Sequence, residues 1–500
     1  MRTTTLALLT AAALIISPCN ADAQKRGGTL TVGLVSDPVT LDPAFMGSYF
    51  ENFIQFNLHE TLVHMTPDME IEPGLAEYRM VDDLTLELKL RPDLKFHDGT
   101  PIDAEAVKFN LDRYLDPKTG SARRTELGPV KSVDVIDPRT VRIKMEQPYS
   151  QLLVALANRA GMMVSPTALK TMGADFATKA VGAGPFKFVS WTKNGQFVLE
   201  RFDGYWRKGM PYLDKIVFRP ISDETVRLTN LRSGTAQLID AVPPQSLAGL
   251  KGDKNVNIVQ RDGVGFYAYS FNVRKPPFDD VRVRRAFVMS VDPNIIQRVV
   301  YFNTGRPAHG PIPPAIKWAF DPNFKGVSYD PAGAKKLLAE AGHPNGLSVT
   351  LTVTSSPINV RNAEIIQSQA TQAGFKVQIR QIDASSNIRV LRAGDFEINQ
   401  STWSGRADPD GNMFNWFSEK GPNNFAGLKN PQISELLVKA RRTLDRPARV
   451  KMYHEAQDLI AKESPMLFTH FDAIIQASRA NLKWTQYPDG AFQLFDASLE

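Results

Sequence analysis

Residues Leu347–Thr354 read LSVTLTVT and residues Phe375–Ile382 read FKVQIRQI, so apolar and polar side chains alternate along both stretches. This period of two predicts two half-buried β-strands. A helical pattern from about residue 360 to 373 lies between them, and a shorter helix is expected at 388–392, before a strand that starts at Phe396. The β-α-β-α-β order predicts a parallel sheet covered by helices, and therefore an α/β fold class.

Helices on either side of this region are expected to begin with an Asp or Asn that is followed by Pro. The first residue caps the helix, and the missing N–H of Pro costs nothing at the first helical position. The pairs are Asp292-Pro293, Asp330-Pro331 and Asn430-Pro431.

The first half of the chain has strands of its own. We expect strands at 28–35 and 84–90, and a strand pair at 133–136 and 140–145. Asp103 is expected to cap a helix that runs to about residue 115. Two separate sets of strands predict at least two sheet-containing lobes, and no low-complexity linker divides them.

The composition is that of an ordinary globular protein. Hydrophobic residues make up 43% and charged residues 22% of the 500 residues. The formal charge of +6 comes from 59 basic and 53 acidic residues that are spread along the chain. Without a Lys/Arg-rich run that could follow a phosphate backbone, nucleic acid is not an expected partner.

The first 23 residues have the features of a secretory signal peptide. The apolar stretch at 6–16 is shorter than the ~20 residues of a membrane span, and Ala21-Asp22-Ala23 is a small-residue cleavage site. A lipid anchor at Cys19 is the less favoured alternative, because Pro18 precedes it where lipoprotein signals have a small residue. We therefore expect a soluble periplasmic protein without cysteine.

Two partial metal motifs do not meet the requirements of the metal sites that they resemble. His59 and His64 are five residues apart, whereas a zinc-protease helix needs a spacing of four. Asp408, Asp410, Asn412 and Glu419 match a calcium loop, but Met413 stands where that loop needs glycine for its sharp turn. The sequence also has no nucleophile elbow and no phosphate-binding loop. We expect no metal, no cofactor and no catalytic residues.

Several segments, in order and spacing, are similar to one family of receptors. The most specific segment is LRPDLKFHDGTP at 90–101, which AEAV at 104–107 follows. SDPVTLDP at 36–43, GAGPF at 182–186 and VRVRRA at 281–286 fit the same order. Together they resemble the dipeptide, oligopeptide, nickel and opine receptors of ABC importers, over nearly all of the chain after the predicted signal peptide.

The resemblance implies a two-lobed periplasmic-binding-protein fold, with a hinge about which the lobes close on a ligand. The first lobe would comprise residues 24–274 and 480–500, with an extra subdomain at about 76–185. The second lobe would comprise residues 275–479. The partners implied are a small or peptide-like solute and the membrane permease of an ABC importer, and we expect the receptor to be a monomer.

The resemblance also places residues beside the ligand. Tyr49 matches a first-lobe position that borders bound peptide, and Trp403, Ser404 and Gly405 match a second-lobe segment that runs beside it. Peptide receptors have Trp-x-x-Asp in that segment, where the Asp binds the free α-amine of the ligand. Arg406 stands at that position here. A guanidinium repels an ammonium and favours a carboxylate, phosphate or sulfonate.

Arg361 and Asp408 complete the candidate set. Arg361 lies near the start of its expected helix, where dipeptide receptors offer an Arg to a ligand carboxylate; the alternative is a surface charge. Asp408 and Asp410 are expected to shape the turn or orient Arg406 rather than contact ligand. Trp403 is either a pocket wall or a core side chain.

The sequence thus predicts a receptor for a peptide-like or opine-like solute that carries an anionic group. A true oligopeptide receptor, with a wide cavity that tolerates the lost Asp, is the alternative within the same class. An exported hydrolase of peptides or glycans is the alternative from another class.

Overall fold

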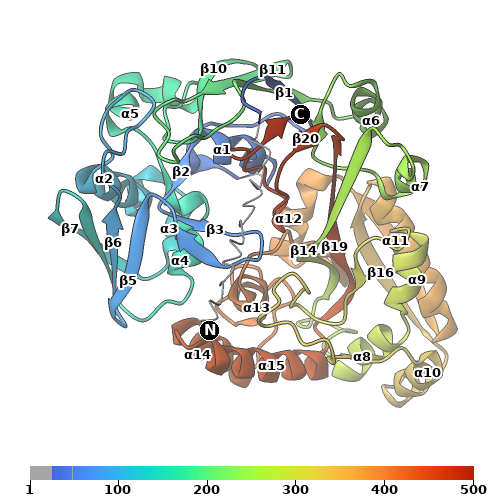
Figure 1. The fold of residues 1–500 in the computed structure, drawn as a ribbon. Coiled ribbons are helices and arrows are strands. Elements are labelled where there is room, and N and C mark those ends of the chain that lie inside the picture. Colours follow the sequence, from blue (N-terminus) through green and yellow to red (C-terminus); the bar gives the residue numbers. More distant parts are fainter. Residues whose placement is uncertain (1–24, 48) are drawn as a thin grey trace, which may run out of the picture.

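The structure is a computed structural model that describes residues 25–47 and 49–500, with the backbone alone at Tyr49. The predicted signal peptide and Cys19 lie outside the described residues. Two lobes are arranged around a pair of long strands, β14 and β19, that run from one lobe into the other (Figure 1). The predicted two-lobed α/β fold is confirmed.

One sheet extends through both lobes, in the strand order β10-β11-β12-β1-β13-β19-β14-β18-β16-β17, with β15 paired to β19 beside this path. The strands are β1 (Thr29–Leu34), β10 (Phe186–Thr192), β11 (Gln196–Arg201), β12 (Lys215–Pro220), β13 (Leu238–Ile239), β14 (Val256–Phe271), β15 (Arg306–Pro307), β16 (Leu347–Thr354), β17 (Phe375–Ile382), β18 (Ile398–Gln400) and β19 (Met466–Arg479).

In the second lobe, β16 is parallel to both β17 and β18, as the β-α-β-α-β order predicts. The helix between β16 and β17 is α11 (Pro357–Gln372), which starts before the predicted residue 360 because Pro357 occupies its first turn. The next helix, α12 (Ala384–Ala393), is longer than predicted, since the side chain of Asp383 accepts a hydrogen bond from the backbone N–H of Ser386. β18 begins two residues after Phe396.

The three predicted Asp/Asn-Pro helix starts are confirmed: each capping side chain accepts a backbone N–H of the first turn. The helices of this lobe are α8 (Val281–Met289), α9 (Pro293–Val299), α10 (Pro331–Glu340), α13 (Pro409–Phe417), α14 (Pro431–Arg442) and α15 (Arg446–Glu463).

The first lobe is built on β1, which is parallel to β12 and β13. Leu30 and Val32 of β1 are fully buried in its core, together with Phe197 and Phe218. Its other elements are η1 (Pro43–Phe45), η2 (Tyr49–Glu51), α1 (Asn52–Leu58), β2 (Glu60–Thr61), β3 (Val63–Met65), β4 (Ile71–Pro73), β9 (Met162–Met163), α5 (Pro166–Met172), η5 (Gly173–Ala177), α6 (Glu224–Ser233), η6 (Pro244–Ser246), α7 (Leu247–Leu250), β20 (Leu482–Lys483) and β21 (Ser498–Leu499).

A separate antiparallel sheet, in the order β5-β6-β8-β7, forms the extra subdomain, on the left in Figure 1. Asp103 caps α2 by accepting the N–H of Ala106, as predicted. The elements are β5 (Ala76–Asp82), β6 (Thr85–Leu90), α2 (Ala104–Leu115), η3 (Pro117–Thr119), α3 (Arg123–Leu127), β7 (Val130–Asp137), β8 (Thr140–Met145), α4 (Leu152–Leu156) and η4 (Arg159–Gly161). The predicted strands at 84–90, 133–136 and 140–145 are confirmed.

The hinge consists of β14 and β19, which pair antiparallel along most of their length. The pairing is interrupted between Asp262 and Phe266. This interruption leaves Gly263, Val264 and Gly265 outside the ladder, where another segment can approach the strand. The lobe boundaries given above stay a prediction.

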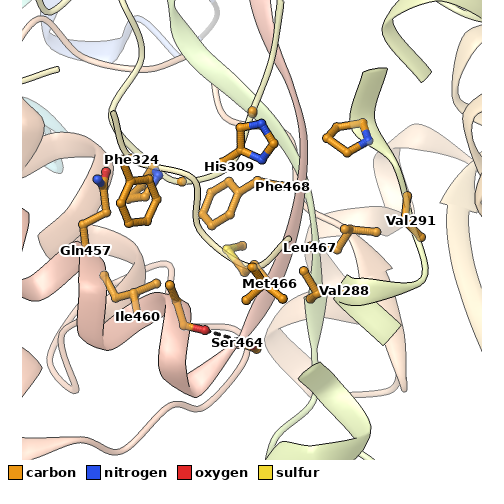
Figure 2. Close-up of a pocket in the computed structure, with 16 residues that line it drawn as sticks. Val288, Val291, His309, Phe324, Gln457, Ile460, Ser464, Met466, Leu467 and Phe468 are labelled. Atoms are coloured by element: carbon orange, nitrogen blue, oxygen red, sulfur yellow. Dashed lines mark hydrogen bonds between the residues drawn. The ribbon is translucent and has the colours of Figure 1, made fainter. Parts of the chain in front are cut away.

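Figure 2 shows a small cavity inside the second lobe, lined by apolar side chains of Val288, Ile460, Met466 and Leu467. Its volume of about 30 Å³ is on the scale of a water molecule, so it is too small for a peptide. Among the described residues, no helix combines the length and apolar character that crossing a membrane requires.

Candidate ligand-binding site

The segment that contains Trp403 and Gly405 is held against the interrupted part of β14. The main chain of Trp403 exchanges two hydrogen bonds with Phe266, each 2.9 Å from nitrogen to oxygen. Gly405 has a φ of +81°, and a Cβ there would stand 1.9 Å from the carbonyl oxygen of Val264. Only glycine permits this approach, and it fixes the position of Arg406, the next residue.

The guanidinium of Arg406 lies over the indole of Trp403, with Cζ 4.6 Å from the ring centroid. Its Nη1 donates to the carbonyl oxygen of Gly405 at 2.7 Å. Burial lowers the pKa of Arg406, with the positive charge of Arg123 adding to this effect and Glu126 opposing it. Within the described part of the chain, no carboxylate forms an ion pair with Arg406. Such a half-buried cation without a carboxylate partner favours an anionic ligand.

Asn412, a residue that was considered only for calcium, organises this segment. Its Oδ1 accepts hydrogen bonds from Trp403 Nε1 at 2.9 Å and from the backbone N–H of Arg406 at 3.1 Å. Its Nδ2 donates to the carbonyl oxygen of Val264 at 2.9 Å. Asn412 is fully buried, so it ties the segment to the hinge strand. The only sequence signal for Asn412 was its place in the partial calcium-loop match.

Asp408 and Asp410 do not contact the Arg406 side chain through any hydrogen bond in the described residues. Both oxygens of Asp408 accept from Arg449 Nη2, at 2.6 and 2.7 Å. Both oxygens of Asp410 accept from Arg441. Asp408 also caps α13 by accepting the N–H of Asp410, so it shapes the turn as expected. Its role as a ligand contact stays a prediction.

The first lobe provides the facing wall. Ala407 packs against the core of the subdomain, which includes Ala157 and Ala160. Arg123 lies in this wall, and its Nη1 is 2.9 Å from Glu126 Oε1. The charges of Arg123 and Glu126 also affect the pKa of Arg406, in agreement with the packing of its neighbour Ala407 on the subdomain core.

The remaining predicted residues are placed less closely together. Ser404 is exposed beside Trp403, and Arg361 is exposed in the second turn of α11. Tyr49 begins η2, next to α1, but its side chain lies outside the described residues. Within the described residues, Arg361 and Arg406 make no contact with each other, so a shared role for the two arginines stays a prediction.

The lobes touch at several points outside this gap. Arg446 donates two hydrogen bonds to Glu70, at 2.9 and 2.8 Å. Lys317 donates to Asp68 at 2.8 Å. The backbone N–H and the hydroxyl of Ser150 both donate to the carbonyl oxygen of Arg441 at 3.0 Å. The structure therefore holds the lobes in contact.

A cavity of about 410 Å³ lies beside these contacts, between Asp68 of the first lobe and Arg306 and Lys317 of the second. This is large enough for several polar groups of a solute.

The metal candidates occupy different settings. His59 follows the end of α1 and His64 lies in β3, so they do not share a helix. Burial lowers the pKa of His59 to about 4, which keeps its ring neutral. Within the residues that the structure describes, no three His, Cys, Asp or Glu side chains are grouped to hold a metal ion.

Comparison with known proteins identifies the family. The description "Bacterial extracellular solute-binding proteins, family 5 Middle" matches residues 70–425. The chain belongs to this family. Its members in these comparisons are named as binding proteins and not as enzymes.

Two kinds of family 5 relative are informative. The glutathione-binding protein GsiB of Shigella flexneri serotype 5b (strain 8401) is 32% identical over 490 residues, with 94% of each chain covered. The periplasmic binding protein DppA of Helicobacter pylori, solved with the peptide STSA, has a TM-score of 0.83 at 26% identity and covers 95% of this chain and 99% of its own. AgaA of A. tumefaciens R10, solved with agropinic acid, has a TM-score of 0.79 at 29% identity, with coverage of 95% and 99%.

Proposed function

We propose that this family 5 protein is a periplasmic receptor that delivers a peptide-like or opine-like solute with an anionic group to the permease of an ABC importer. Closure of the two lobes holds the solute. The observation that carries this proposal is Arg406, which is half-buried next to the packing of Ala407 on the subdomain core and has no carboxylate ion-pair partner among the described residues.

The solutes named for the relatives support this charge class. Glutathione and agropinic acid both carry carboxylate groups, and the corresponding proteins are named for binding them or were solved with them. The peptide STSA, bound by the Helicobacter pylori protein, shows that peptides are also bound on this fold. A general oligopeptide receptor is the less favoured alternative, because the guanidinium of Arg406 repels the α-ammonium of an ordinary peptide.

A binding screen distinguishes a receptor from an exported hydrolase. Purified protein is incubated with glutathione, opines, dipeptides and oligopeptides, and the melting temperature and product release are both measured. A receptor with one site gains about 2.7 kcal/mol of stability at a ligand concentration of 100 Kd and releases no product. We expect anionic solutes to give the largest shifts. Turnover of any solute, or shifts only with cationic peptides, would contradict the proposal.

We also propose that the exported chain begins near Gln24, after removal of the segment that ends with Ala21-Asp22-Ala23. The intact mass of the protein from the periplasm should correspond to loss of the first 23 residues. A mass that shows an acylated amino terminus at Cys19 would instead make the protein membrane-anchored.

A further inference from the structure

The cavity of about 410 Å³ between the lobes is bounded by the hinge strand β14 as well as by both lobes. Pro67 and Asp68 belong to the turn between β3 and β4 of the first lobe, and Lys317 comes from the second lobe. The hinge strand contributes Arg261 and Asp262, which come directly before the interruption of its pairing with β19. A group bound in this cavity would therefore contact each of the parts that lobe closure moves relative to one another.

Three cations and two carboxylates of the described residues line this cavity. Two of the cations are paired with the two carboxylates. Lys317 Nζ donates to Asp68 Oδ1 at 2.8 Å, and Arg306 Nη2 is 3.0 Å from Asp262 Oδ2. The remaining cation is Arg261, so the lining side chains have one positive charge in excess.

Arg261 is half-buried and forms no ion pair with a carboxylate in the described part of the chain. Its Nη1 lies 3.5 Å from the carbonyl oxygen of Pro67, at the limit of a hydrogen bond. The hydrogen bond from Lys317 is the main cause of the lowered pKa of Asp68, and the charge of Arg261 adds a smaller contribution. The planar fork of the Arg261 guanidinium is thus available to bind the oxygens of an anion.

The cavity and the segment at 403–406 adjoin the same part of the hinge strand. Arg261 is three residues before Val264, whose carbonyl oxygen accepts from Asn412 and lies against Gly405. Three residues of extended chain span at most about 11 Å. An elongated solute with two acidic groups about this far apart is the kind that fits both places.

We propose that this cavity is a second anion site, in which Arg261 binds an oxyanion with the support of Lys317 from the second lobe. The occupant is a carboxylate or sulfate-like group, supplied either by a second acidic group of the solute or by a free inorganic anion. The first source rests on the proposed function, and the second does not. An anion held between the hinge strand and the second lobe stabilises the closed state more than the open one, which is the condition for ligand-driven closure.

Sulfate is a suitable probe, because its oxygens match a guanidinium and its use does not depend on knowing the natural solute. The melting temperature is measured as a function of low-millimolar sulfate, with chloride at equal ionic strength as the reference. Wild type should show saturable stabilisation by sulfate. Arg261→Gln should reduce the apparent sulfate affinity about tenfold or more.

Two further variants test whether the effect is specific. Arg124→Gln is the matched control, since Arg124 is exposed on α3, and it should bind sulfate as wild type does. Arg261→Lys keeps the positive charge and should retain sulfate binding. In chloride alone, Arg261→Gln should melt close to wild type, because the long contact with Pro67 is weak. A purely structural Arg261 would instead make this variant less stable and leave its sulfate affinity unchanged.

Calorimetry distinguishes the two sources of the anion, with the solute that gives the largest melting shift in the binding screen. If this solute displaces sulfate and binds Arg261→Gln about tenfold or more weakly than wild type, the cavity holds an acidic group of the solute. If the solute binds both proteins alike and sulfate still binds in its presence, the occupant is a free anion.

Two outcomes would overturn the assignment: absence of saturable sulfate stabilisation in wild type, or unchanged sulfate affinity in Arg261→Gln. If Arg406→Gln loses sulfate while Arg261→Gln keeps it, the sulfate binds at Arg406, so the second site is wrong and the anionic receptor still stands. Failure of every anionic solute in the binding screen would count against the receptor itself.

Discussion

Two groups of arginines lie near the amino-terminal end of α13, and they differ in how their charge is compensated. Arg449 and Arg441 each face a buried carboxylate, Asp408 and Asp410. Arg406, only two residues before Asp408, has a carbonyl oxygen and an aromatic ring as its contacts.

This difference distinguishes an arginine that stabilises the fold from one whose charge is available to bind a ligand. Arg449 and Asp408 satisfy each other, and the tyrosine hydroxyl of Tyr453 accepts from the same nitrogen of Arg449 at 3.0 Å. Such a pair ties α15 to the start of α13 and has no need of a ligand. Arg406 has no such carboxylate partner among the described residues, and we expect an anionic solute to balance its charge.

The largest effect is expected on the stability of the fold, when an arginine that pairs with a buried carboxylate is replaced. Arg449→Ala leaves the Asp408 carboxylate buried without its partner, which typically costs about 3–5 kcal/mol. The free energy of unfolding, measured by chemical denaturation, should fall by that amount. Arg446→Ala is the control, because Arg446 is the exposed first residue of α15 and its pair with Glu70 lies at the surface. Equal stability of Arg449→Ala and wild type would remove the distinction between the two groups.

The next effect is expected on binding. Arg406→Ala should weaken the anionic solute that gives the largest melting shift by about 100-fold or more, at about 1.4 kcal/mol per decade. The unliganded variant should melt close to wild type, because Arg406 has no carboxylate partner to lose among the described residues. Calorimetry on both proteins measures the affinity. Wild-type affinity in this variant would make Arg406 a structural charge only.

The smallest effect on stability and affinity is expected for the exposed ion pairs that join the two lobes. Glu70→Gln removes the inter-lobe pair with Arg446, whose side chains are about half exposed, and such pairs contribute about 0.2–1 kcal/mol. Solute affinity should fall less than about fivefold. X-ray scattering should still show a smaller radius of gyration when solute is added. Loss of that compaction would mean that the rim contacts, rather than the solute, drive closure.

Much of the fold could be predicted from local patterns. The strands Leu347–Thr354 and Phe375–Ile382 have the predicted bounds, because alternation is unambiguous where one strand face is half-buried. The start of α11 was predicted too late, although Ser356-Pro357 resembles the Asp-Pro start signals; in the structure Ser356 makes no capping hydrogen bond. The polar start of α12, at Ser385 and Ser386, made that helix look shorter than it is.

The candidate site was less accessible to prediction. The segment at 403–406 was found through its similarity to a family motif, and the structure adds the physical reason for Gly405. The hydrogen bond from Asn412 to the carbonyl oxygen of Val264 could not be found in this way, because 148 positions separate the two residues and only the packing of the fold brings them together. The ion pairs of Asp408 and Asp410 likewise depend on α14 and α15, which follow later in the chain.

The most direct test of the central claim is an experimental structure of the protein with the solute that it retains through purification or that gives the largest melting shift. The account predicts an anionic group within hydrogen-bond distance of Arg406, with the lobes closed around it. A neutral or cationic solute between the lobes, or an anionic solute that does not contact Arg406, would contradict it.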